Sequence, residues 1–384
     1  MNDPSARLLQ IGPLPPPATI GMALNEVDTP ALLLNLDLFE RNLARLPQSL
    51  RGSSVQVRPH AKSHKCPEIA LRQIAHGAVG VCCQKVSEAE ALVAGGVLDV
   101  LVANEVVGAQ KIARLAALAR DARISVCVDD IDNVAQLGEA ANRARSTLHV
   151  LVEINVGANR CGVEPGDSVL PLAQAITRYE SLHFAGLQAY HGGAQHLRTP
   201  AARQQAIDEA IGEVRRTLSV LQTAGLRAEI ITGAGTGTYL LEAQSGVYNE
   251  IQPGSYIFMD ADYGRNLNDA GEPVQEFEQS LFILATVMSH PAPLRAVVDV
   301  GLKAHSIDSG MPLVADLPGV RYTRASDEHG VLELDTPHVV RLGQKIKLVP
   351  GHCDPTVNLY DWLVCYRGDR VEALWSVAGR GAFY

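Results

Sequence analysis

Lys62 is the residue whose type and position best suit covalent chemistry. It follows the β-branched run 55–57 at the end of an expected strand, and His60 and His64 stand on either side of it. An amine close to other cations loses proton affinity. An amine with a lowered pKa is a nucleophile suited to Schiff-base formation with a carbonyl group. For a lysine taken alone a basic surface loop is the better interpretation, but the residues that follow reverse that preference.

Two glycine turns offer backbone donors for an anion. The first, 232–238, reads Thr-Gly-Ala-Gly-Thr-Gly-Thr, and the second, 252–256, reads Gln-Pro-Gly-Ser-Tyr. Glycines let backbone N–H groups approach a phosphate closely. The first turn is not a P-loop, because no Gly-Lys-Ser/Thr closes it, and a flexible turn is the alternative. Two such turns and a strand-end lysine suit pyridoxal phosphate, a carbonyl cofactor that carries a phosphate.

A pair of potential metal ligands, His352 and Asp354, lies within Pro-Gly-His-Cys-Asp-Pro-Thr at 350–356. In an extended strand residues i and i+2 point the same way, so these side chains could share one cation while Cys353 faces away. Imidazole and carboxylate together suit Mn²⁺ or Mg²⁺. A loop pair without metal is the alternative. The iron oxygenases that also use His-x-Asp need a distant histidine on a jelly roll, which the strand and helix pattern speaks against.

Two further segments could contact a cofactor ring. Arg160 follows a strand expected to end at Asn155, and it could face a phenolate or a carboxylate. Tyr190 and His191 end another expected strand and could stack on a ring and move protons. A surface arginine and a buried core pair are the alternatives.

Strands that alternate with helices predict the class of fold. Helical patterns such as Ser87 to Ala94, Ala109 to Arg120 and Ala202 to Ala224 separate short apolar runs, as in βαβ units with a parallel sheet. We expect an α/β fold with a TIM-like (β/α)8 barrel, and a doubly wound sheet is second because no GxGxxG follows an early strand. The eight expected strands are 55–61, 78–83, 99–104, 124–129, 149–155, 184–190, 228–232 and about 247–258.

The pattern changes near residue 275 to β-rich runs, which predicts a C-terminal all-β domain. These runs are 280–290, 295–301, 339–349 and a hairpin at 363–374. We expect an N-terminal arm over 1–30, the cofactor-binding barrel over 31–270 and the β-rich domain over 271–384. The early strand 31–36 could pair with that last domain.

Composition excludes several classes of protein. The chain of 384 residues carries a net charge of −9 without a basic stripe, which argues against a nucleic-acid binder. No apolar run approaches the roughly 20 residues that span a bilayer, and the N-terminus lacks a signal-peptide pattern. The seven cysteines show no zinc-type spacing and are typical of reduced thiols. We therefore expect a cytoplasmic protein that binds no membrane.

Together these motifs resemble the D-threonine aldolase and 3-hydroxyaspartate aldolase family, which belongs to the alanine-racemase-like, fold-type III pyridoxal-phosphate enzymes. The resemblance covers nearly the whole chain from Val27. It implies a barrel plus a β-domain, a homodimer, pyridoxal phosphate and a divalent metal, Mn²⁺ or Mg²⁺. The segments that carry it are 58–68, 81–90, 160–162, 188–192, 256–260 and 349–356.

The activity that this resemblance implies is cleavage of a small β-hydroxy-α-amino acid into glycine and an aldehyde. The substrate would be 3-hydroxyaspartate, which gives glyoxylate, or D-threonine, which gives acetaldehyde. Segments 260–265, 307–310 and 352–358 are nearer to the 3-hydroxyaspartate members, while 14–17 and 58–60 are nearer to the D-threonine members. We favour 3-hydroxyaspartate.

Roles follow from the resemblance for individual residues. Lys62 would be the Schiff-base lysine, Arg160 and Tyr190 would pack around the ring, and Gln252 would face the ring nitrogen. His352 and Asp354 would hold the metal. The general base would be His64, His191 or a metal-bound water. The two turns would hold the phosphate with Gly235, Thr236, Gly237, Gly254, Ser255 and Tyr256.

Three other functions share parts of this pattern. A dehydratase of D-serine or 3-hydroxyaspartate has the same fold and cofactor, but that branch has a cysteine where Asp354 stands here. A racemase has the lysine and barrel but no use for His-x-Asp. A non-catalytic pyridoxal-phosphate carrier lacks a β-domain.

Overall fold

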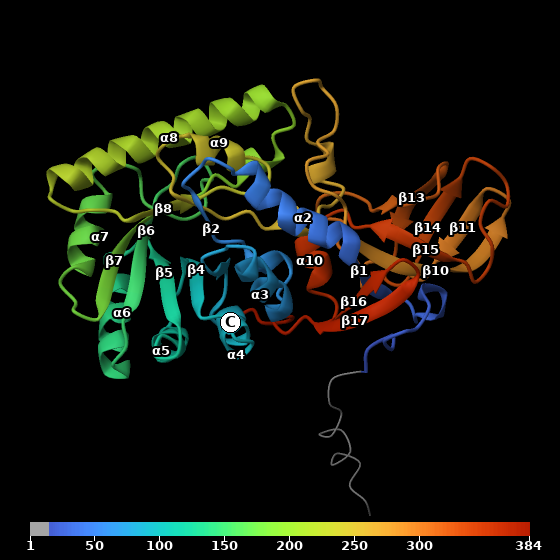
Figure 1. Ribbon diagram of the computed structural model, residues 1–384, viewed down its shortest axis with the longest axis horizontal. Coiled ribbons are helices and arrows are strands. Elements are labelled where there is room, and N and C mark those ends of the chain that lie inside the picture. Colours follow the sequence, from blue (N-terminus) through green and yellow to red (C-terminus); the bar gives the residue numbers. More distant parts are fainter. Residues whose placement is uncertain (1–14) are drawn as a thin grey trace, which may run out of the picture.

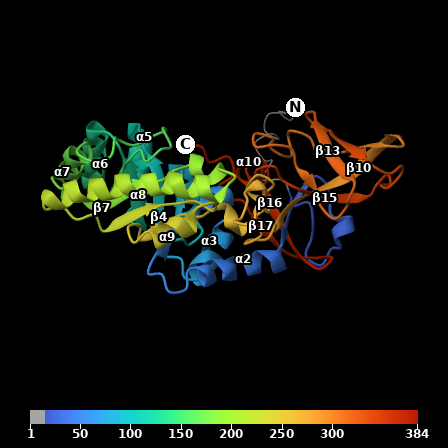
Figure 2. The same ribbon diagram turned by 90° about the horizontal axis from the view of Figure 1, so that it is seen from above.

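The computed structural model describes residues 15–384, so residues 1–14 of the expected N-terminal arm lie outside the described residues. Two parts lie side by side, a barrel-like part and a β-rich part (Figures 1 and 2). The helices are η1 Leu24–Glu26, α2 Leu36–Ser49, η2 Ala61–Ser63, α3 Pro67–Ala75, α4 Val86–Ala94, α5 Ala109–Leu118, α6 Ile131–Ala144, α7 Val169–Ile176, η3 Gly193–His196, α8 Pro200–Thr223, α9 Tyr239–Gln244, η4 Ser255–Ile257, η5 Tyr263–Arg265 and α10 Cys353–Val357, where η marks a 3₁₀ helix.

The first part is a curled parallel sheet of eight strands, in the order β2-β9-β8-β7-β6-β5-β4-β3. A parallel bridge between His60 and Cys82 joins its two ends, and helices cover its outside (Figure 1). The expected barrel is therefore confirmed. Its strands are β2 Gln56–Val57, β3 Val81–Cys83, β4 Asp99–Glu105, β5 Arg123–Val128, β6 Leu148–Glu153, β7 Leu182–Ala189, β8 Ile230–Gly233 and β9 Glu250–Ile251.

Local sequence explains these elements. β5 buries five consecutive residues, 124–128, because a strand of a barrel is covered on both faces. Thr199 caps the long helix α8 by accepting a hydrogen bond from the backbone N–H of Ala202 at 3.3 Å, and Pro200 occupies the first turn.

Two strands are much shorter than the sequence predicts. The expected strands 55–61 and 247–258 keep only two residues each, β2 and β9. Pro59 and Pro253 lack the N–H that a sheet needs, and the chain then turns into η2 and η4. These early strand ends place Lys62 and Ser255 at the mouth of the barrel.

The second part is a nine-stranded, mostly antiparallel sheet, which confirms the expected β-rich C-terminal region. β1 belongs to this sheet, where it lies antiparallel to β10 and parallel to β16. The expected strand 339–349 keeps only its second half. The strands are β1 Ala31–Asn35, β10 Leu281–Ala292, β11 Arg295–Val298, β12 Leu313–Val314, β13 Val320–Ala325, β14 Gly330–Leu334, β15 Lys345–Val349, β16 Trp362–Arg367 and β17 Arg370–Ser376.

The short helix α10 connects the two parts. It follows β15 of the second sheet and packs against η2 of the barrel, and Figure 1 places it between them. Residues that follow the second sheet therefore reach the barrel mouth. None of the helices in residues 15–384 combines the length and the apolar composition needed to cross a membrane.

Candidate active site

A cavity of about 510 Å³ opens where the carboxyl ends of the barrel strands meet α10. In a (β/α)8 barrel this end is where active sites form. Nine of the residues that the sequence singles out line it: Lys62, Arg160, Tyr190, Gly235, Thr236, Gln252, Gly254, Ser255 and Asp354.

Lys62 is the only lysine among the residues that line this cavity. Its Nζ lies 2.5 Å from Oδ2 of Asp354. Burial alone would lower the pKa of Lys62, but the Asp354 carboxylate raises it above the ordinary value. The expectation of a lysine with a pKa lowered by neighbouring cations is therefore wrong for this state of the chain. The neighbours fail to act as cations because burial lowers the pKa of His60 and brings that of His64 to about 4, so both rings are neutral.

The two glycine turns present unpaired backbone donors. Within residues 15–384, the N–H groups of Gly235, Thr236, Gly254 and Ser255 donate to no protein acceptor. Buried backbone donors are almost always paired, so four free donors from residues that line one cavity indicate an anionic ligand. The Thr236 hydroxyl accepts a hydrogen bond from the N–H of Tyr256 at 3.0 Å, which ties the two turns together. This donor set fits a phosphate group.

Other side chains that line the cavity are polar or aromatic. The amide of Gln252 donates to Oε1 of Gln188 and to the hydroxyl of Thr232, both at 2.8 Å. The guanidinium of Arg160 lies 5.9 Å from the centre of the Tyr190 ring. Burial raises the pKa of Tyr190, although Lys62 and Arg160 oppose this, and the hydroxyl stays protonated. A flat ring with polar edges fits between these groups, so the cavity suits pyridoxal phosphate as a whole.

His352 and Asp354 are held at a junction of strand and helix rather than along a strand. His352 is extended and precedes α10, whereas Asp354 lies in the first turn of that helix. The argument from i and i+2 in a strand is therefore wrong. Cys353 is also not turned away, because its Sγ donates to Oδ1 of Asp354 at 3.2 Å. Burial would raise the pKa of Asp354, but Lys62 and His352 lower it far below the usual range. The carboxylate is therefore ionised, which is the form that binds a metal.

The His352 ring is oriented by a second carboxylate. Its Nδ1 lies 2.8 Å from Oδ2 of Asp308. Such a carboxylate fixes the ring of a metal-binding histidine and leaves the other nitrogen for the ion. The donor types at His352 and Asp354 therefore fit a divalent cation.

Five residues from the sequence prediction do not line this cavity, namely His352, which lies beside Asp354, and His64, His191, Gly237 and Tyr256. The His64 ring is fully buried, and its Nδ1 accepts a hydrogen bond from the N–H of Cys66 at 3.1 Å, so it does not reach a substrate in the cavity. His191 packs against Gly157 instead. Gly237 lines a different cavity, described below. The Tyr256 hydroxyl accepts a hydrogen bond of 3.1 Å from the side-chain amide of Gln73. Neither His64 nor His191 is therefore supported as the base, because neither ring faces the cavity.

The structure adds five side chains that the sequence prediction missed. His60, Gln84, Gln188 and Tyr263 lie in segments that carry the resemblance, but they had no assigned role, and His196 lies in none of these segments. The side-chain nitrogen of Gln84 lies 2.8 Å from Nε2 of His60 and holds that neutral ring at the cavity wall. The five are His60, Gln84, Gln188, His196 and Tyr263.

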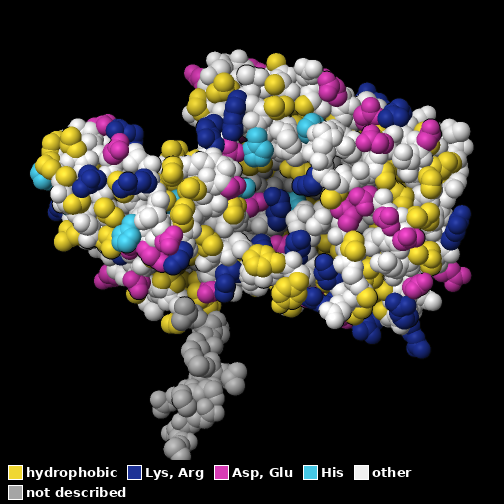
Figure 3. All heavy atoms as spheres, turned by 180° about the vertical axis from the view of Figure 1, so that it is seen from behind, with side chains coloured by type: hydrophobic (Ala, Val, Ile, Leu, Met, Phe, Trp, Pro, Cys, Tyr) yellow, Lys and Arg dark blue, Asp and Glu magenta, His cyan; other side chains and the backbone are white. Residues whose placement is uncertain are grey.

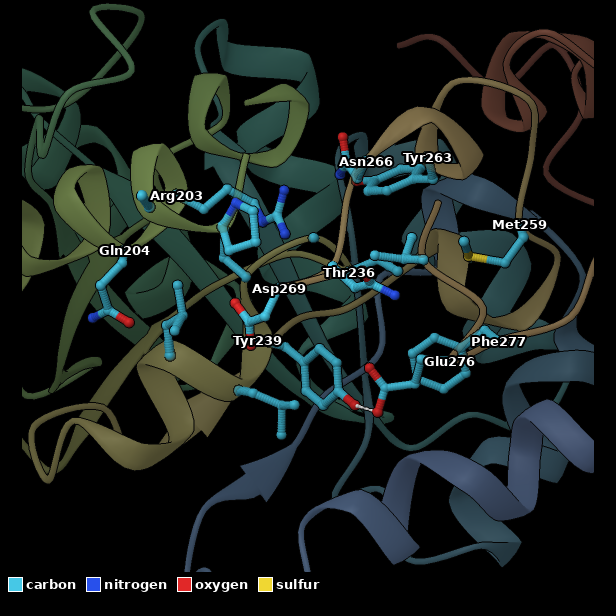
Figure 4. Close-up of a pocket in the computed structure, with 18 residues that line it drawn as sticks. Arg203, Gln204, Thr236, Tyr239, Met259, Tyr263, Asn266, Asp269, Glu276 and Phe277 are labelled. Atoms are coloured by element: carbon cyan, nitrogen blue, oxygen red, sulfur yellow. Dashed lines mark hydrogen bonds between the residues drawn. The ribbon is translucent and has the colours of Figure 1, made fainter. Parts of the chain in front are cut away.

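A second cavity of about 540 Å³ is lined by residues 236–241, which follow Gly235 in the chain (Figure 4). Thr236 and Tyr263 line both cavities. Tyr239 donates a hydrogen bond of 2.7 Å to Glu276 across its floor. Although this cavity is slightly larger, no lysine lines it, so we assign the covalent chemistry to the cavity of Lys62.

A further group of potential metal ligands lies at neighbouring strand ends. Ligand atoms of Glu105, Asp129 and Cys161 lie within 4.8 Å of one another. None of the three lines the Lys62 cavity, and Asp129 already accepts a hydrogen bond from the N–H of Gly162 at 3.0 Å. Asp354 does line this cavity, 2.5 Å from Lys62, so the pair at His352 and Asp354 is the one placed to act on a substrate held at Lys62.

Comparison with known proteins now assigns the family. Residues 34–262 match the model described as "Alanine racemase, N-terminal domain", which spans the barrel and most of the cavity. The chain belongs to the alanine-racemase-like, fold-type III family. Residues 280–366 also match a model described as "Putative serine dehydratase domain", so the β-rich part has relatives of its own.

Three relatives in this alanine-racemase-like family are informative. A 3-hydroxy-D-aspartate aldolase from Paracoccus denitrificans is 46% identical over 96% of both chains. The crystal structure of a D-threonine aldolase from Filomicrobium marinum is 50% identical, covers 96% of this chain and 100% of its own, and has a TM-score of 0.93. A variant of D-threo-3-hydroxyaspartate dehydratase, solved in a metal-free form, is 25% identical over 92% of this chain and 98% of its own, with a TM-score of 0.83.

Proposed function

We propose that this chain is a pyridoxal-phosphate- and metal-dependent aldolase, which cleaves D-configured 3-hydroxyaspartate or threonine into glycine and an aldehyde. The observation that carries the proposal is the position of Asp354 beside Lys62. It puts the amine that would bind the cofactor and the carboxylate that would bind a metal 2.5 Å apart in one cavity. The two aldolase relatives at 46% and 50% identity support the reaction type.

Residues of this chain would hold the cofactor at three points. Lys62 would bind its aldehyde carbon, and the free N–H groups of both glycine turns would bind its phosphate. Arg160 and Tyr190 would pack around its ring, and Gln252 would face the ring nitrogen. When bound, pyridoxal phosphate supplies an electron-poor ring that stabilises the negative charge left at Cα when the Cα–Cβ bond breaks.

The metal would bind at His352 and Asp354, where a divalent ion such as Mn²⁺ or Mg²⁺ would act as a Lewis acid on the β-hydroxyl group. Asp308 would hold the His352 ring in place. The metal-free form named for the dehydratase relative supports metal binding in this family.

Product analysis tests the function and separates it from the alternative of a dehydratase, which the match of residues 280–366 keeps open. The purified protein, loaded with pyridoxal phosphate and Mn²⁺, is incubated with the D and L isomers of 3-hydroxyaspartate and threonine. We expect glycine with glyoxylate or acetaldehyde from the D isomers. Release of ammonia with a keto acid, and no glycine, would refute the aldolase.

We also propose that the protein is a homodimer that works in the cytoplasm. The family resemblance supports the dimer, and sedimentation measurements test it. All seven cysteines are free thiols, and six of them are buried, as suits a reducing compartment.

A further inference from the structure

The distance between Lys62 and Asp354 depends on where α10 lies relative to the barrel. α10 has only five residues and follows the second sheet, whereas Lys62 belongs to η2 of the barrel. On the face drawn in Figure 3, the molecular surface is hollowed between the two parts, so close packing does not join them everywhere. Polar contacts at this junction can therefore decide where α10 lies.

A second lysine, Lys65, joins the end of α10 to the segment that carries Lys62. Its side chain is only 11% exposed, and its Nζ donates a hydrogen bond of 2.9 Å to Oδ1 of Asn358. Asn358 caps the C-terminal end of α10, and its N–H donates to the carbonyl of Asp354 at 3.4 Å. A buried cation three residues after Lys62 thus holds the helix that carries Asp354.

Glu88 holds Lys65 on the side of the barrel. Its Oε1 lies 3.0 Å from Nζ of Lys65, and its side chain is 4% exposed. Its Oε2 accepts hydrogen bonds from the N–H groups of Gln84 at 2.8 Å and Lys85 at 3.0 Å, directly before α4. A buried ion pair is firmly held only when further hydrogen bonds satisfy its carboxylate, as here. Since Gln84 also holds His60, Lys65 is connected to the cavity wall.

The segment 379–384 covers the same junction. Figure 1 shows it running from β17 to α4, and the N–H of Ser87 in α4 donates to the carbonyl of Tyr384 at 2.9 Å. The N–H of Gly379 donates to the carbonyl of Lys65 at 2.9 Å, and the ring centre of Phe383 lies 5.4 Å from Nζ of Lys65. This cover keeps water from Lys65, which strengthens its polar contacts.

We propose that Lys65 is a positioning residue for the metal site, which through Asn358 holds α10 where Asp354 can bind a metal beside Lys62. Lys65 does not line the Lys62 cavity, so it acts on the ligands and not on a substrate. This inference rests on the proposed function, since the metal belongs to it.

Metal affinity tests this role without turnover. In Lys65→Met and in Asn358→Leu, we expect the Kd of Mn²⁺ to rise about 10- to 100-fold, as when the support of a metal ligand is lost. Electron paramagnetic resonance of the protein loaded with pyridoxal phosphate measures it. The Kd of pyridoxal phosphate should change less than about threefold, because Lys62 and both glycine turns belong to the barrel.

Lys345→Met is the matched control. Lys345 also joins two segments, by donating to the carbonyl of Val27 at 2.8 Å and to the hydroxyl of Thr286 at 3.0 Å, but it lies outside the cavity. Both lysine variants should melt at a lower temperature than wild type, and only Lys65→Met should lose Mn²⁺ affinity. A role in stability alone would leave the Mn²⁺ affinity of both unchanged.

The double variant tests whether Lys65 acts through Asn358. If it does, Lys65→Met combined with Asn358→Leu should lose no more Mn²⁺ affinity than either single change. Losses that multiply, or a Kd of Mn²⁺ within about threefold of wild type in both single variants, would overturn the proposal. Asn358→Leu keeps the ion pair of Lys65 and Glu88, so it decides the question if Lys65→Met does not fold.

Hydrogen exchange gives a readout that needs neither metal nor substrate. In the protein without added metal, the N–H groups of α10 should exchange at least about tenfold faster in both single variants, as for the loss of a charged hydrogen bond. Those of β4 should keep their rates, and unchanged rates in α10 would contradict the proposal. If wild type binds no Mn²⁺, the metal site of the proposed function fails, while hydrogen exchange still decides whether Lys65 holds α10.

Discussion

The ammonium group of Lys62 and the carboxylate of Asp354 lie 2.5 Å apart, although 292 positions separate them in the chain. Lys62 belongs to η2 at the mouth of the barrel, and Asp354 belongs to α10, which follows the second sheet. The candidate site is therefore complete only when both parts of the molecule are in place. Each prediction below tests one component of that site or of its support.

Replacement of Lys62 with alanine should remove covalent cofactor binding. The variant should lose the visible absorbance of the cofactor-loaded protein and at least about a thousandfold in kcat, because no other lysine lines the cavity. Absorption spectra after gel filtration measure this. Lys303→Ala, at an exposed ion pair with Glu328, should leave the spectrum unchanged. A normal spectrum in the Lys62 variant would refute its role.

Replacement of Asp354 with asparagine should separate the metal from the cofactor. We expect the visible spectrum to remain while kcat falls about a hundredfold or more, because one of two protein ligands is lost. Asp316→Asn is the control, since Asp316 pairs with Lys347 at 2.7 Å outside the cavity. Chelation of the wild type should also stop cleavage, and Mn²⁺ or Mg²⁺ should restore it. Full activity after exhaustive chelation would contradict a metal site at His352 and Asp354.

The glycine turns should tolerate no added methyl group. A Cβ on Gly235 would lie 2.6 Å from Oε1 of Gln195, so the turn must shift in Gly235→Ala. We expect the affinity for pyridoxal phosphate to fall about tenfold or more, measured by equilibrium dialysis. In Gly212→Ala, on an open face of α8, the affinity should not change and stability should rise by about 1 kcal/mol. Equal affinities in the two variants would argue against a phosphate site at these turns.

Glu242 should make the stability of the fold depend on pH. Burial raises its pKa from 4.5 to about 8, so the folded state holds it protonated where the unfolded state ionises. Its contribution to the free energy of unfolding is complete below pH 4.5 and declines as the pH rises to about 8. Glu242→Gln should therefore melt several degrees above wild type at pH 8 and at the same temperature at pH 4. Exposed Glu272→Gln is the control, and an equal melting temperature at pH 8 would contradict the assignment.

Local patterns in the sequence were sufficient for most of the barrel and for much of the site. Alternation of apolar runs and helices located all eight strands, and Lys62 and the glycine turns stand out because each is a short motif at a strand end. Their motifs are local, and the barrel brings every strand end to one face. The roles of these residues, unlike the fold, stay predictions.

Relationships between distant segments were not predictable in this way. The carboxylate that raises the pKa of Lys62 comes from the opposite end of the chain, so the sequence suggested a lowered pKa. His196 is 66 positions from Asp262, so no local pattern joins the two residues. His64 stands two residues from Lys62 but turns into the core, because a 3₁₀ helix, rather than a strand, carries this segment.

Reduction of the cofactor-loaded protein with borohydride, followed by mass spectrometry of its peptides, tests the central claim most directly. Borohydride makes the bond between the lysine and pyridoxal phosphate permanent, so the modified peptide identifies the lysine. We predict that the cofactor remains on the peptide that contains Lys62. A cofactor found on any other lysine, or on none, would contradict the account.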